Sequence, residues 1–175
     1  MSKSPVKIGI PKWSDKELVL NLVMGSFAPG KELNIIPQEL QKTETQDYDY
    51  YIIQFKGPIL REWKEAVEKE GVILQNYLPN YAFIAGMKRD IVNTVFSKEY
   101  VNYIGIYQPY YKILVDKYSG SKELNIWVFS KEKIQDVVQK LRSQGFAEVK
   151  IHDENIIRAR GTYSQVIMAA KLTEV

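Results

Sequence analysis

Side chains that could carry catalysis are scarce in this chain. His152 is the single histidine among 175 residues, and there is no cysteine. A serine–histidine–acid triad would have to use His152, yet no G-x-S-x-G segment or comparable nucleophile setting is present. His152 stands beside Asp153 and Glu154, and we interpret it as a plain surface residue. The sequence therefore predicts a protein without catalysis of its own, and without a zinc site.

Phosphate-binding and carboxylate chemistry find no better support. Gly57 and Gly86 are isolated, so no glycine-rich phosphate loop is present. Glu68 and Glu70 belong to a helical segment rich in lysine and glutamate, which is typical of a solvated face. We predict no bound cofactor.

Composition narrows the classes of partner. The net charge is +3 and the hydrophobic content is 45%. Such a small charge indicates no strong attraction to nucleic acid or membranes. No apolar run reaches the length of a spanning helix. Leu18–Phe27 is interrupted by Asn21 and is not interpreted as a signal peptide.

The stretch from Tyr50 to Tyr111 predicts strand, helix, strand, strand, helix, strand. Tyr50–Phe55 is a β-branched and aromatic run, followed by helical spacing of apolar residues that ends at Gly71. Two short strands, at 72–77 and 81–87, flank the turn at Pro79, and a second helix precedes the last strand at 103–107. This βαββαβ order is that of the ferredoxin-like fold.

Residues 1–49 are predicted to form an N-terminal extension and polar linker. Val6–Ile10 has the pattern of a strand. Ser14 followed by Glu17 has the spacing of a capping box, which favours a short helix over Asp15–Met24.

A shift of 74 residues, from Tyr50 to Leu124, superimposes the rest of the chain on this unit. Trp63 then meets Val137, Val67 meets Leu141, and Gly71 meets Gly145. This self-similarity predicts a tandem duplication, with units at 50–115 and 123–175 joined by the connector 116–122. The predicted fold class is α+β, with two tandem ferredoxin-like units, each an antiparallel four-stranded sheet with two helices on one face.

The second unit lacks its last strand, because the position equivalent to Tyr103 lies beyond Val175. Three explanations are open: a longer parent polypeptide, which we favour, a strand from the N-terminal extension, or a strand from a partner.

Alternation along the strands predicts which residues face the helices and which face the open side of the first sheet. Tyr51, Ile53 and Phe55 form the better core set. The open face would then be rich in tyrosine and isoleucine, as buried interface centres are. In the second unit we place Leu124, Ile126 and Val128 on the equivalent open face.

The segment Tyr50–Lys112 resembles the propeptide domains of subtilisin-like serine proteases, especially long archaeal and bacterial pro-regions. The matching features are YYIIQFKGPI in the first strand, Tyr77, the N-Y-A-F segment from Asn80 to Phe83, and V-x-Y-I-G-I-Y-Q-P from Val101 to Pro109. The match covers about a third of the chain well and the second unit more loosely.

This resemblance implies an intramolecular chaperone and inhibitor that docks its open sheet face on the protease catalytic domain. Binding only the native protease would stabilise it by mass action. It also implies an extracellular or cell-surface location. The predicted partner-binding residues are Tyr50, Ile52, Tyr77, Asn80, Tyr81, Ile84, Tyr103 and Tyr107.

Three alternatives remain at this point. The face is covered inside the molecule, by the N-terminal extension or by the second unit. The sheet binds RNA, with Tyr50, Tyr103 and Tyr107 stacking on bases and Arg158 and Arg160 contributing charge, although no RNP motif is present. The paired units bind a small metabolite, for which no specific motif is seen.

Overall fold

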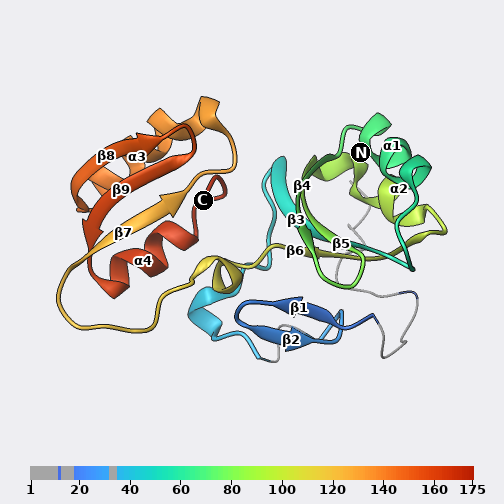
Figure 1. Cartoon of the computed structure of the whole chain (residues 1–175), viewed down its shortest axis with the longest axis horizontal. Coiled ribbons are helices and arrows are strands. Elements are labelled where there is room, and N and C mark those ends of the chain that lie inside the picture. Colours follow the sequence, from blue (N-terminus) through green and yellow to red (C-terminus); the bar gives the residue numbers. More distant parts are fainter. Residues whose placement is uncertain (1–11, 13–17, 32–34) are drawn as a thin grey trace. The chain divides into compact units, whose positions relative to one another are not determined.

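The computed structural model describes residue 12 and residues 18–31 and 35–175. It divides into two compact units, Met1–Tyr111 and Lys112–Val175. Both are mixed α+β structures with antiparallel sheets, and the described residues contain four α-helices (Figure 1). No helix in the described part of the chain is both long and apolar enough to cross a membrane.

The first unit contains the predicted order of strands and helices. The elements are β3 (Tyr48–Phe55), α1 (Arg61–Lys69), β4 (Ile73–Leu78), β5 (Ala82–Lys88), α2 (Val92–Ser97) and β6 (Val101–Ile106). They form a four-stranded antiparallel sheet in the order β4-β5-β3-β6. Short 3₁₀ segments stand at Gln38–Leu40, Arg89–Ile91 and Pro109–Lys112.

Alternation correctly predicted the core side of this sheet. Tyr51, Ile53 and Phe55 are fully buried with Val67 of α1 and Val92 of α2. Ala85, Ile104 and Ile106 join the same cluster, as expected from their positions. The helices therefore cover the face that the strand periodicity assigned to them.

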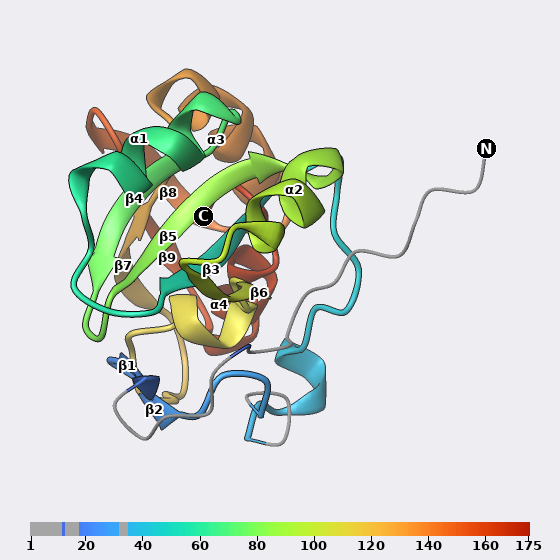
Figure 2. The ribbon, with the colours of Figure 1, turned by 90° about the vertical axis from the view of Figure 1, so that its right-hand side faces the viewer.

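The N-terminal segment forms a small β-hairpin where a helix was predicted. Its strands are β1 (Leu20–Leu22) and β2 (Gly25–Phe27). The helix prediction over Asp15–Met24 is therefore wrong for residues 19–24, because Leu20–Leu22 pair with Gly25–Phe27 as an antiparallel ladder and Leu20 is fully buried. The predicted strand Val6–Ile10 lies outside the described residues. The hairpin lies on the side of the sheet away from α1 and α2 (Figures 1 and 2).

The second unit repeats most of this plan. Its elements are β7 (Lys122–Trp127), α3 (Ile134–Ser143), β8 (Ala147–Asp153), β9 (Ile156–Gly161) and α4 (Tyr163–Ala170), with a 3₁₀ segment at Lys131–Lys133. The sheet order is β7-β9-β8. Both helices contribute to one core, which includes Val137, Leu141 and Ala169. Among the described residues, no fourth strand pairs with this sheet.

Core positions of the second unit have counterparts in the first unit, but not at one uniform offset. Val137 and Leu141 pack in the second core as Trp63 and Val67 do in the first, which agrees with a shift of 74. The first strand follows a shift of 73, because Leu124, Ile126 and Val128 are the core counterparts of Tyr51, Ile53 and Phe55. The placement of these three residues on the open face is thus wrong.

One residue explains that error. Eight positions separate Phe55 from Trp63, whereas nine separate Val128 from Val137. A single extra residue between strand and helix moves every side chain of the strand to the other face. The open face of the second sheet therefore carries Glu123, Asn125 and Trp127 on β7.

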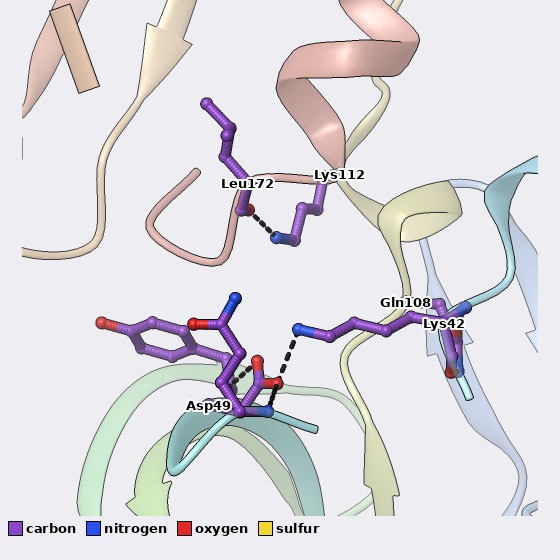
Figure 3. A network of polar contacts seen from close by, with 7 residues as sticks. Lys42, Asp49, Gln108, Lys112 and Leu172 are labelled. Carbon is purple, nitrogen blue, oxygen red and sulfur yellow. Dashed lines mark hydrogen bonds and ion pairs between the residues drawn. The ribbon is translucent and has the colours of Figure 1, made fainter. Parts of the chain in front are cut away.

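Local signals at the ends of α1 and α3 are shared by the two units. Gly71 and Gly145 follow the helices with φ of 97° and 82°, a conformation that favours glycine. In the second unit, Lys112 Nζ also donates to Leu172 O at 2.7 Å, which ties the start of this unit to the end of α4 (Figure 3).

Candidate functional site

The predicted docking face of the first unit is buried beneath the chain's own N-terminal segment. Tyr50, Ile52, Ile84 and Tyr103 point to this face, and each is at most 6% exposed. The segment from 18 to 40 contributes the residues that are buried on the covering side: Leu18, Leu20, Phe27, Ile36 and Leu40. The expectation of an open face is therefore wrong, and the alternative of a cover from the N-terminal segment holds. Burial of these apolar side chains removes them from water, which stabilises the folded state of the first unit.

Polar contacts hold the cover at its centre. Gln54 is fully buried, and its Nε2 donates to Leu18 O at 2.6 Å and to Asn80 O at 3.1 Å. Asn102 Nδ2 donates to Gln54 Oε1 at 2.9 Å. Asn80 Nδ2 donates to Val19 O at 2.6 Å. The predicted partner-binding residue Asn80 thus binds the cover itself.

Glycines leave room for the tyrosines of this face. A Cβ on Gly105 would lie 1.9 Å from Tyr103 Oη, and one on Gly86 would lie 2.2 Å from Tyr48 Oη. The phenol rings therefore lie close against glycine backbone in β6 and β5. Mid-strand glycine, which often marks close approach by another group, was the sequence signal for this arrangement.

Tyr77 lies on the helix side of the sheet and not on the open face. It pairs with Phe83 in the register of β4 and β5, and cross-strand partners share a face. Phe83 packs against the core under the helices, and its ring centroid is 5.4 Å from that of Tyr77. Tyr77 is 56% exposed, so it is the most accessible of the predicted partner-binding residues.

Tyr81 and Asn80 form the turn between β4 and β5. Their φ values are 64° and 65°, in the left-handed region that residues other than glycine rarely adopt. Tyr81 O accepts a hydrogen bond from Phe55 N at 2.8 Å, which fixes the turn to the end of β3. Tyr81 also packs at the edge of the first core. Both residues are half-buried, and their structural roles are clear.

Tyr107 ends the predicted set. Its N donates to Tyr50 O at 3.0 Å, and its ring centroid is 6.0 Å from that of Tyr111. Burial raises the pKa of Tyr107 to about 12. A phenol in this setting stays neutral at physiological pH and acts in packing.

Next to β3, an ion pair anchors the segment that joins the cover to the sheet. Lys42 Nζ lies 2.6 Å from Asp49 Oδ2, and Asp49 is 3% exposed (Figure 3). Gln108 makes two bonds with the backbone of Lys42, at 2.7 and 3.0 Å. Asp49 also accepts from the backbone N of Gln46 at 3.1 Å. This network has the character of a structural clamp.

The sheet face of the second unit is different, because it is polar and exposed. Trp127 on β7 is 59% exposed. Arg158 and Arg160 on β9 lie opposite Asn125 and Glu123 of β7. A large exposed indole beside two guanidinium groups is a combination enriched at the energetic centres of protein interfaces.

Both arginines on this face lie close to a carboxylate. Arg160 Nε lies 3.3 Å from Glu148 Oε1, and Arg158 Nε lies 3.8 Å from Glu123 Oε1. Arg158 Nη2 is 3.0 Å from His152 Nε2, which accepts because guanidinium only donates. These groups are at least partly exposed, so each contact contributes about 0–1 kcal/mol. They leave the face accessible to a partner.

The structure brings no catalytic constellation together in its described residues. No group of three or more histidine, cysteine, aspartate or glutamate side chains in that part of the chain could hold a metal ion. His152 is exposed, as predicted, and its neighbour is an arginine.

A family model matches residues 21–108, which is half of the chain. The chain belongs to this family, whose description is "Domain of unknown function (DUF8729)". The matched residues include the hairpin β1–β2 except for Leu20, together with the whole four-stranded sheet. No curated protein and no solved structure matches the chain.

Proposed function

We propose that this chain is a non-catalytic protein-binding module of two tandem ferredoxin-like units, which serves as the pro-region of a subtilisin-like serine protease. In this proposal it assists folding of the catalytic domain and inhibits it. The partner class rests on the resemblance of Tyr50–Lys112 to such propeptides. The strand order β4-β5-β3-β6, with the core residues of both helices on one face, supports the ferredoxin-like description.

The exposed sheet face of the second unit is the docking surface in this proposal. The observation that carries it is Trp127, 59% exposed, on the same face as Arg158 and Arg160. The first sheet offers no such area, since the N-terminal segment covers it. The proposed docking surface is therefore the indole and guanidinium groups of the second unit, and not the tyrosines of the first unit that the sequence predicted.

Inhibition and refolding assays with a purified subtilisin-type catalytic domain test this function. We expect tight inhibition and a higher yield when the denatured domain refolds in the presence of the full chain. Trp127→Ala should weaken inhibition by about tenfold or more, the usual cost of removing an interface anchor. Met168→Ala is the matched control, because Met168 is a similarly exposed apolar residue on α4. Absence of both inhibition and refolding assistance would contradict the proposal.

RNA binding is the second candidate. Lys150 lies opposite Arg158 in the sheet register, so three cations and Trp127 share the face on which RNA-binding sheets stack bases. The carboxylates Glu123 and Glu148 reduce the net charge there. Retention on single-stranded RNA that falls steeply with salt, and is lost in Trp127→Ala, would favour this function over protease binding.

A further inference from the structure

Strand β7 of the second unit has one unpaired edge among the described residues. It is the first strand in the order β7-β9-β8, whereas its counterpart β3 is paired on both sides, with β5 and with β6. The same position in the fold is thus central in one unit and an edge in the other. An edge strand presents unpaired N–H and C=O groups that can pair with another chain.

The backbone directions show which groups this edge presents. Val128 N donates to Asn155 O on the β9 side, and Phe129 N donates to Glu174 O on the opposite side. Alternate residues of a strand direct their backbone groups to opposite sides. The N–H and C=O groups of Glu123, Asn125 and Trp127 therefore point to the unpaired edge.

A residue shortly after the first strand makes an equivalent backbone hydrogen bond in both units. The bond from Phe129 N to Glu174 O, at 2.8 Å, has its counterpart in the bond from Lys56 N to Tyr100 O, at 3.0 Å. In the first unit that bond immediately precedes β6, which starts at Val101. The second unit therefore has the geometry that admits a fourth strand.

The two edges of the second sheet are unequally protected. The pairing of β8 with β9 is interrupted by register shifts between Ala147 and Lys150 and between Ile151 and Asp153. Such irregularities blunt an edge. The pairing of β7 with β9 is continuous over six residue pairs, from Lys122 to Trp127. Only β7 thus offers a regular ladder.

We propose that the edge of β7 binds an extended segment of a partner protein, which adds as an antiparallel fourth strand in the register of β6 on β3. That register places Ile106 opposite Tyr51 and Ile104 opposite Ile53. The bound segment therefore carries apolar side chains at the two positions opposite Leu124 and Ile126, where they extend the core.

Charge defines a further position of the ligand. Glu123 corresponds to Tyr50, whose carbonyl binds Tyr107 N in the first unit. Its side chain is 59% exposed and its contact with Arg158 is 3.8 Å long. A lysine or arginine of the bound segment opposite Glu123 supplies the complementary charge. This strand site is separate from the sheet face proposed above, so either can fail without the other.

Amide hydrogen exchange on the full chain tests the strand site. The probe is a synthetic peptide with the sequence of Tyr100–Pro109, which contains the strand that fills this place in the first unit. We expect the peptide to slow exchange of the Asn125 and Trp127 amides. A version with lysine at the position of Tyr107 should bind more tightly, because it meets Glu123.

N-methylated peptides provide a control that does not alter the protein. Directly after β6, Tyr107 N points to β3, so the Gly105 N–H does as well, whereas that of Ile106 points away. Methylation at the Gly105 position should weaken binding by about tenfold or more, because it removes a donor to β7. Methylation at the Ile106 position should weaken binding less than that. On the protein, Asn125→Pro removes an edge donor and should give a similar loss, with Asn125→Ala as its control.

Three results would overturn the proposal. They are no effect of the peptide on the β7 amides, equal binding of the two methylated peptides, and Asn125 and Trp127 amides that are already protected without peptide. Inhibition of a protease by the chain has no bearing on these outcomes, so the two proposals are distinguishable.

Discussion

At the scale of single residues, one buried amide joins three parts of the first unit. Gln54 on β3 binds the carbonyls of Leu18 and Asn80 and accepts from Asn102. Gln54 alternates with the core residues Ile53 and Phe55, so it lies on the same side of the strand as Tyr50 and Ile52. That it is fully buried follows only from the presence of the cover.

Replacing Gln54 by leucine should lower the free energy of unfolding by about 2–4 kcal/mol. The substitution removes the donor to the Leu18 and Asn80 carbonyls, and a buried acceptor left without its donor costs about 1–3 kcal/mol. Urea unfolding measures the change. Gln139→Leu on the exposed face of α3 is the control and should change stability by less than about 0.5 kcal/mol. Equal effects of both variants would contradict the buried network.

Tyr107 should titrate late in alkaline solution. Burial raises its pKa to about 12, above the ordinary value of 10.0. Because the folded state favours the neutral phenol, its contribution to stability is complete below pH 10.0 and is lost as the pH rises through about 12. Tyrosinate absorbance should therefore show a late component that is smaller in Tyr107→Phe, since burial also raises the pKa of Tyr48, Tyr51 and Tyr118. A wild-type titration that coincides with that of the variant would refute this assignment.

At the scale of elements, the hairpin β1–β2 and the residues after it cover the apolar face of the first sheet. A capping-box spacing at Ser14 and Glu17 favoured a helix, but Leu20–Leu22 form a strand and both Leu18 and Leu20 are buried. Tertiary burial thus decided between two local preferences. The family match includes all of this hairpin except Leu20, which agrees with its role as part of the domain.

Leu20→Ala should destabilise the first unit by about 2–5 kcal/mol, because Leu20 is fully buried and its removal leaves a cavity. Val23→Ala is the control within the same hairpin, since Val23 is 84% exposed, and should have little effect. Thermal unfolding measures both. Binding of a hydrophobic dye should rise in Leu20→Ala if the covering segment detaches more often and exposes Tyr50 and Tyr103. Equal stability of the two variants would contradict the role of Leu20.

At the scale of the whole molecule, each unit contains its own hydrophobic core. The first is built on β3, β5 and β6 with α1 and α2, and the second on β7 and β9 with α3 and α4. The division between them falls at Tyr111 and Lys112. A protein of this kind is expected to lose structure unit by unit.

Leu141→Ala should lower amide protection in β7 and β9 by about 2–5 kcal/mol and leave that of β3 and β5 unchanged. Met87→Ala should have the reverse effect, because Met87 belongs to the first core as Leu141 belongs to the second. Native-state hydrogen exchange measures both variants. Protection that falls equally in both units after either substitution would show one cooperative core.

Local sequence patterns were enough to predict much of the secondary structure and the core residues of the first unit. The order of strands and helices and the core faces of β3, β5 and β6 follow from alternation and helical spacing, and the ends of α1 and α3 follow from the glycines 71 and 145. These features depend on neighbours in the chain, so the amino-acid order carries them directly.

Tertiary structure decided what is accessible. Whether Tyr50 and Tyr103 face water depends on the segment 18–40, which lies outside the strands that carry them and which no local pattern of those strands records. The face of β7 depends on one extra residue before α3, because side chains alternate with a period of two. Since contacts distant in sequence set both outcomes, the tyrosines became core and Trp127 became surface.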